Sequence, residues 1–151
     1  MADRGDADTG DLEGGCLCGA VRYRIAGAIT PTGVAYCHCR TCRRSSGAPV
    51  MAWATFPTAA VWLTRGAPAA HASSPKALRQ FCPACGTQLF FAYTEGEPEL
   101  DVALGSLDDP TALVPAYHIW TSSRLPWFDT ADSLPRHADD GPDWSPYRTD
   151  P

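Results

Sequence analysis

The sequence lacks a long apolar run. Its apolar stretches, such as residues 48–56, are much shorter than the roughly 20 residues that a membrane-spanning helix needs. The chain also begins with an acidic, glycine-rich segment, without the basic and then apolar pattern of an export signal. We therefore expect a cytoplasmic protein without a membrane partner.

A basic excess is missing as well. The 151 residues include 12 Lys and Arg against 17 Asp and Glu, which gives a formal net charge of −5. A surface that binds nucleic acid through its phosphates needs an excess or at least a stripe of basic residues. The composition therefore predicts no nucleic acid partner, although Arg40, Arg43 and Arg44 can still form a local positive site.

Helical periodicity is rare, and short segments of alternating apolar residues dominate. Val21, Tyr23 and Ile25 alternate with arginines, which is typical of a half-buried strand. Further strands are expected from the aromatic and β-branched segments at residues 50–56, 59–66, 88–93, 100–107 and 117–123. The first two of these should be joined by a turn at Pro57.

Helix signals are confined to two segments. Residues 40–47 predict one short helix that ends at Gly47, and residues 108–115 suggest a single helical turn. The expected fold is mainly β and forms a single domain. The expected parts are a disordered acidic tail at residues 1–12, the domain at residues 13–136 and a C-terminal tail at residues 137–151.

The seven cysteines are odd in number and lie in a chain without an export signal, so a disulfide framework is disfavoured. Extended backbone places positions i and i+2 on one face, which suits Cys16 and Cys18. A Cys-x-x-Cys turn with Pro83 and Gly86 directs backbone N–H groups at two further sulfurs. Together these motifs predict a structural Zn²⁺ site made of Cys16, Cys18, Cys82 and Cys85.

The other three cysteines, Cys37, Cys39 and Cys42, lie in one short segment and can converge on one metal ion. Structural zinc sites are closed by four protein ligands, whereas catalytic sites have three and an open position. The triple therefore predicts a second Zn²⁺ with a catalytic role. A further side chain such as His118 or Asp129 would instead close the site.

Two histidines have more than one interpretation. His38 separates Cys37 from Cys39 and should point to the opposite side, where it packs or forms a hydrogen bond. His118 and Trp120 alternate with Ile119, so both should face one side of a strand. There His118 is either a general base or a satisfied structural residue.

Polar residues near the triple are candidate substrate ligands. Arginine binds carboxylates through two parallel hydrogen bonds, so Arg40, Arg43 and Arg44 are expected to bind the carboxylates of a substrate. They can alternatively offset the charge of a zinc–thiolate cluster or lie on a solvated helix face. Ser46, at the end of the predicted helix, can add a hydroxyl group to the same site.

Other assignments are less compatible with the spacing. An iron–sulfur cubane needs four cysteines, and a redox dithiol at Cys82 and Cys85 competes with the ligand turn that Gly86 favours. A B-type methionine sulfoxide reductase needs two Cys-x-x-Cys pairs and a separate nucleophilic cysteine. A zinc-scaffolded binding module without turnover stays open, and a fourth ligand on the second zinc would identify it.

Five segments resemble, in order, the motifs of the glutathione-dependent formaldehyde-activating enzyme family, whose domain also occurs in centromere protein V. The likeness runs from about Gly14 to Arg136 and includes all seven cysteines. The segments are residues 14–25, 37–49, 81–91, 100–110 and 118–127.

The resemblance implies a β-tent fold with a four-cysteine structural zinc and a three-cysteine catalytic zinc. It also implies a carbon–sulfur lyase that acts on the adduct of a small thiol and an aldehyde. S-hydroxymethylglutathione, formed from glutathione and formaldehyde, is the adduct named for the family. Related folds also serve non-catalytic zinc proteins, so the fold does not fix the substrate. A homodimer is compatible with this resemblance.

Overall fold

The computed structural model describes residues 10–141. Residues 1–9 and 142–151, which hold most of both predicted tails, lie outside this range. Within it no helix is long and apolar enough to cross a membrane.

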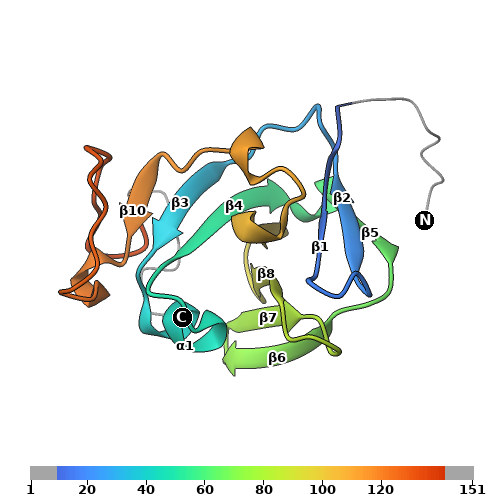
Figure 1. Ribbon diagram of the computed structural model, residues 1–151, viewed down its shortest axis with the longest axis horizontal. Coiled ribbons are helices and arrows are strands. Elements are labelled where there is room, and N and C mark those ends of the chain that lie inside the picture. Colours follow the sequence, from blue (N-terminus) through green and yellow to red (C-terminus); the bar gives the residue numbers. More distant parts are fainter. Residues whose placement is uncertain (1–9, 142–151) are drawn as a thin grey trace.

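The described chain is mainly β, as predicted, and residues 10–141 contain one α-helix, α1 (Arg40–Ser46) (Figure 1). The strands are β1 (Leu12–Gly15), β2 (Arg22–Ile25), β3 (Gly33–Cys37), β4 (Met51–Pro57), β5 (Val61–Arg65), β6 (Ala69–Ser74), β7 (Ala77–Phe81), β8 (Gln88–Tyr93), β9 (Glu99–Ala103) and β10 (Tyr117–Ile119). Short 3₁₀ turns cover Thr58–Ala60, Leu104–Ser106, Pro110–Ala112 and Thr121–Ser123.

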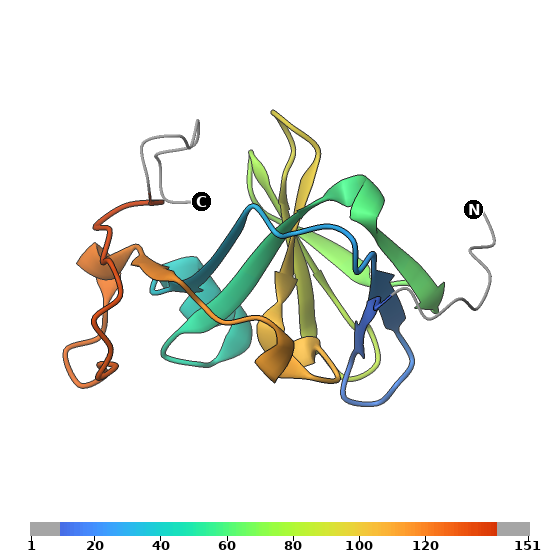
Figure 2. The same ribbon diagram turned by 90° about the horizontal axis from the view of Figure 1, so that it is seen from above.

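The strands form two sheets. The smaller sheet has the order β1-β2-β5, and the larger has the order β10-β3-β4-β9-β8-β7-β6. All neighbours are antiparallel except β10 and β3, which are parallel. Figure 2 shows the small sheet at one end of the molecule and the segment after β10 at the other.

The turn expected at Pro57 is present and joins β4 to β5. Both predicted strands are present, as β4 and β5, but they belong to different sheets. The 3₁₀ turn at Thr58–Ala60 carries the chain from the large sheet to the small one. As a result, β2 and β5 of the small sheet cover one side of the core, and β4 of the large sheet contributes residues to its other side.

The large sheet has one face toward this core and one toward a cleft. In β4, Ala54 and Phe56 are buried in the core, whereas Trp53 and Thr55 line the cleft, because successive strand residues point to opposite faces. Residues that are paired on neighbouring strands point to the same face, so the residues that face the cleft form rows across the sheet. One row of it is formed by Gly33, Thr55, Asp101, Phe91 and Arg79.

The small sheet closes the core from the other side. Tyr23 and Ile25 of β2 are fully buried, and the Tyr23 ring meets Phe90 edge-on with centroids 5.0 Å apart. Ser106 Oγ donates to the Ala103 carbonyl, so Tyr23 Oη donates to Ser106 Oγ, at 2.7 Å. This internal hydrogen bond lets a phenol be buried without an unpaired polar atom.

Helix α1 has the predicted bounds. Cys39 precedes it in an extended conformation, and its Sγ accepts a hydrogen bond from the Cys42 N–H at 3.3 Å. Gly47 ends the helix at φ 72, a left-handed conformation that glycine adopts without strain. The predicted turn in residues 108–115 is also present, at Pro110–Ala112.

Strand β10 is shorter than the predicted strand at residues 117–123. It ends at Ile119 because Trp120 adopts a left-handed conformation, with φ 55 and ψ 37. The expectation that His118 and Trp120 face the same side is therefore wrong. Trp120 lines the cleft, and the His118 ring contacts His38 instead.

Candidate functional site

The seven cysteines are all free and form two groups. Within each group the sulfur atoms all lie within 4.8 Å of one another. One group contains Cys16, Cys18, Cys82 and Cys85, and the other contains Cys37, Cys39 and Cys42. Each group could hold a metal ion.

The four-cysteine group joins the loop after β1 to the turn between β7 and β8. The Val21 N–H donates to Cys16 Sγ at 3.2 Å, and Thr87 Oγ1 lies 3.2 Å from Cys85 Sγ. The contact with Thr87 is the main reason why the pKa of Cys85 is lowered to about 5. Leu17, which lies between Cys16 and Cys18 in the sequence, is 88% exposed. The group therefore joins two segments that are far apart in the sequence, which the hydrogen bond from the Leu17 N–H to Thr87 Oγ1, at 3.0 Å, also links.

The three-cysteine group is buried and lies where β3 meets α1. Cys37 ends the strand, Cys39 caps the helix and Cys42 lies inside it. Hydrogen bonds from Cys37 and then Cys42 lower the pKa of Cys39 to about 2. The contact with Cys39 is in turn the largest cause that raises the pKa of Cys37 well above its ordinary value. One thiolate is thus stabilised by two thiols, and a divalent cation would let all three become thiolates.

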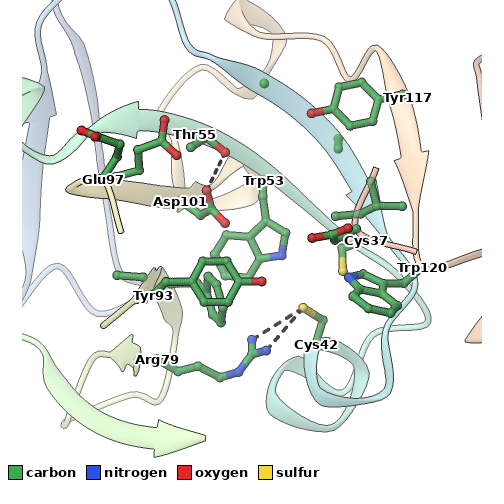
Figure 3. Close-up of a pocket in the computed structure, with 17 residues that line it drawn as sticks. Cys37, Cys42, Trp53, Thr55, Arg79, Tyr93, Glu97, Asp101, Tyr117 and Trp120 are labelled. Atoms are coloured by element: carbon green, nitrogen blue, oxygen red, sulfur yellow. Dashed lines mark hydrogen bonds between the residues drawn. The ribbon is translucent and has the colours of Figure 1, made fainter. Parts of the chain in front are cut away.

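A cleft of about 390 Å³ opens onto this group. Cys37 and Cys42 line one end of it (Figure 3). Its walls are mainly apolar and aromatic, from Trp53, Phe91, Tyr93, Tyr117, Ile119 and Trp120. The cleft therefore combines a reactive polar end with walls that displace water.

The carboxylates of Glu97 and Asp101 lie at the end of the cleft away from the cysteines (Figure 3), and Glu99 and Asp140 also line the cleft. Burial raises the pKa of Asp101 to about 6, although a hydrogen bond from Thr55 Oγ1, at 2.5 Å, acts in the opposite direction. The two ends of the cleft thus differ in chemical character.

Arg79 of β7 is a residue that sequence reasoning missed. It is 3% exposed, lines the cleft, and donates from Nη1 and Nη2 to Cys42 Sγ at 3.6 and 3.7 Å. Its guanidinium carbon lies 4.9 Å from the centre of the Phe91 ring. The residue opposite it in the β7–β8 register is also Phe91, so the pairing of the strands fixes this contact.

The predicted substrate ligands lie elsewhere. Arg40, Arg43, Arg44 and Ser46 are all in α1, and none of them is among the residues that line the cleft. Ser46 Oγ donates to the Cys42 carbonyl at 2.7 Å and lies on a second, shallow depression beside Cys85. The structure therefore brings the cysteines together but leaves these four residues outside the cleft.

The two histidines form a buried chain behind β3. His38 Nε2 and His118 Nδ1 are 2.9 Å apart, and His118 Nε2 lies 3.1 Å from Asp132 Oδ1. Both histidines are completely buried. Among the described residues the three sulfurs have no histidine ligand in their group, so His38 is on the opposite side, as expected. This geometry favours a structural role for His118, because it does not line the cleft.

Comparisons with known proteins agree with this geometry. A family model for the glutathione-dependent formaldehyde-activating enzyme matches residues 11–123. A Schizosaccharomyces pombe protein named as an uncharacterized lyase is 38% identical over 87 residues, which are 58% of this chain and 61% of that protein. A crystal structure of a Rhodobacter sphaeroides protein is similar, with a TM-score of 0.54 and 26% identity over 68% of this chain and 97% of that one.

Proposed function

The chain belongs to the family of the glutathione-dependent formaldehyde-activating enzyme, and on this premise we propose that it is a carbon–sulfur lyase. Its substrate would be the adduct of a small thiol and an aldehyde, with S-hydroxymethylglutathione as the expected example. The observation that carries the proposal is the three-cysteine group at the end of a cleft that Cys37 and Cys42 line. Family membership alone leaves the substrate open, since this chain spans only 61% of its lyase relative.

We assign Cys37, Cys39 and Cys42 as ligands of a catalytic Zn²⁺. Three buried sulfurs, of which Cys39 has its pKa lowered by hydrogen bonds from the other two, suit a divalent cation that binds thiolates. In residues 10–141 no histidine or carboxylate joins the three sulfurs within 4.8 Å, which supports an open position. When bound there, zinc would lower the pKa of a thiol that enters from the cleft.

A second Zn²⁺ is assigned to Cys16, Cys18, Cys82 and Cys85. Four sulfurs within 4.8 Å of one another form a complete tetrahedral ligand set, as in structural zinc sites. These cysteines join two segments that are far apart in sequence. Metal binding here would therefore contribute directly to folding.

The reaction itself needs no oxidant or reductant. In the synthetic direction the thiol sulfur attacks the aldehyde carbon, a carbon–sulfur bond forms, and the proton of the thiol ends on the former carbonyl oxygen. The reverse reaction breaks that bond and releases thiol and aldehyde. The chain confines the two reactants between Trp53, Phe91 and Tyr93, so that orientation and exclusion of water favour the addition.

Binding of thiol carboxylates by Arg40, Arg43, Arg44 and Ser46 stays a prediction. A carboxylate that reaches these residues must extend from the cleft over α1, because none of them lines the cleft. A cytoplasmic location and a homodimer also stay predictions.

Substitution of one cysteine in each group separates the two metal roles. We expect about two zinc ions per chain in the purified protein. Cys42→Ser should lose mainly one of them together with turnover, while the fold is kept. Cys82→Ser should lose the fold, because the four-cysteine site crosslinks distant segments.

Turnover is measured as formation of the thiol–aldehyde adduct after subtraction of the spontaneous reaction. Each variant is the control for the other, because both replace one buried cysteine by serine. Wild-type turnover in Cys42→Ser would refute the catalytic assignment. A fully zinc-loaded wild-type protein that converts no thiol–aldehyde pair would instead indicate a binding module.

A further inference from the structure

Arg79 is a buried cation that donates hydrogen bonds to side chains of α1 and β6. Its Nη2 donates to Thr41 Oγ1 at 3.0 Å, its Nη1 to Ser45 Oγ at 3.4 Å, and its Nε to Ser73 Oγ at 3.2 Å. Both terminal nitrogens also reach Cys42 Sγ (Figure 3). The guanidinium group is therefore held against α1 at the three-cysteine group.

The group of negative character that contacts this buried charge directly is a sulfur, Cys42 Sγ, whereas Asp101 in the same cleft acts on it only at longer range. Between residues 10 and 141 no carboxylate forms an ion pair with Arg79, and Thr41, Ser45 and Ser73 offer only neutral hydroxyl groups. A charge that is 3% exposed is costly unless an opposite charge compensates it. The nearest group that can carry such a charge is the Cys42 thiolate and, through it, the other two cysteines.

Charge balance shows what Arg79 does once a metal is present. Three thiolates and one divalent cation leave one net negative charge, which Arg79 neutralises. A further thiolate from the cleft would then bring the assembly to one negative charge, whereas without Arg79 it would reach two. Accumulated negative charge in a buried site opposes the entry of an anionic sulfur.

We infer that Arg79 is the counter-ion of the three-cysteine group. As a positioning residue it increases the affinity of that group for a divalent metal and admits a thiolate from the cleft. The first part depends only on the contacts of Arg79 with Cys42. The second part rests on the function proposed above. The four-cysteine group provides an internal contrast, since in the described part of the chain no guanidinium group donates to its sulfurs.

The metal part is tested with Arg79→Gln, which removes the charge but keeps an amide donor, and Arg79→Lys, which keeps the charge. Zinc is titrated out of each holoprotein with a chromophoric chelator, and cobalt(II) absorption identifies the site that is emptied. We expect Arg79→Gln to weaken the three-cysteine site about 10- to 100-fold and leave the four-cysteine site unchanged. Arg79→Lys should recover part of this loss. Arg24→Gln, in the small sheet, is the matched control.

Three results would overturn the metal part. Unchanged affinity at the three-cysteine site in Arg79→Gln would show that the charge is unnecessary. Equal weakening of both sites, or equal loss in the Gln and Lys variants, would show that Arg79 only packs β7 against α1. If Arg79→Gln does not fold, Arg79→Met provides the neutral side chain that can still cover Phe91.

The thiolate part is tested by adding glutathione to the cobalt(II)-substituted proteins without an aldehyde. The sulfur-to-cobalt absorption should change at lower glutathione concentration in wild type than in Arg79→Gln, by about tenfold or more. Equal concentrations would refute this part. The readout needs no turnover, so a wild type that binds glutathione but produces no adduct would contradict the proposed function and leave the inference about Arg79 standing.

Discussion

Asp101 allows the electrostatics of the cleft to be tested quantitatively. Its carboxylate lines the cleft, and burial raises its pKa from 3.8 to about 6. Asp101→Asn removes the titration but keeps an oxygen that can accept the hydrogen bond from Thr55 Oγ1. The substitution therefore isolates the cost of ionising this side chain inside the folded protein.

The sign of the effect follows from the raised pKa. Between pH 3.8 and about 6 the folded protein keeps a proton on Asp101 that the unfolded chain has lost, so stability falls as pH rises through this window. The difference of about 2 pKa units corresponds to at most about 3 kcal/mol above pH 7. Asp101→Asn should gain stability relative to wild type as pH rises, by about 1 kcal/mol between pH 5 and pH 8.

Urea denaturation in zinc-buffered solution, at several pH values in this range, measures the difference between variant and wild type. Titrations that both proteins share cancel in this difference. Asp108→Asn is the control: a hydrogen bond from Arg22 lowers the pKa of Asp108, so its contribution to stability changes only below its ordinary pKa, and the difference for this variant should stay constant between pH 5 and pH 8. A difference for Asp101→Asn that does not change with pH would refute the argument that this carboxyl group is desolvated.

Two further substitutions test local features of the fold by urea denaturation. Tyr23→Phe removes the buried hydrogen bond to Ser106 Oγ and should cost about 1 kcal/mol of unfolding free energy, and an unchanged stability would contradict this account. Gly47→Ala should also cost about 1 kcal/mol, because a side chain strains the left-handed conformation at φ 72. Gly105→Ala is its control, since a methyl group there meets nothing within 4 Å and φ is ordinary, so equal losses would refute the strain argument.

The strands that could be predicted are those with a clear apolar pattern. The strands predicted at residues 20–27 and 88–93 are present as β2 and β8. Their aromatic and β-branched residues are buried in the core, and this burial produces the apolar pattern in the sequence. Strand β3 was missed as a strand of its own, since Gly33 and Ala35 face the cleft and small residues give no apolar signal. Strand β6, with the sequence AAHASS, is mostly exposed at the sheet edge and gives no such signal either.

The two cysteine groups could be predicted from the sequence because each depends on short spacings between cysteines. Spacings of two and three residues determine which sulfurs share a face, and the structure brings together the same four and the same three sulfurs. The left-handed conformation of Trp120 could not be predicted from the sequence. It depends on contacts with residues far along the chain, such as the hydrogen bond from the Trp120 N–H to the Asp139 carbonyl.

Helix geometry explains why Arg40 and Arg44 do not contact Cys42, although they are close to it in the sequence. Successive helix residues are about 100° apart, so Arg40 and Arg44, each two positions from Cys42, are turned away from it. The arginine that does reach Cys42 Sγ comes from another element, β7. In β7 the alternation of faces turns Arg79 toward the cleft, and its register with Phe91 of β8 sets its depth. A slip of that register by one residue would turn Arg79 away from the cleft and remove the positive charge from the sulfurs.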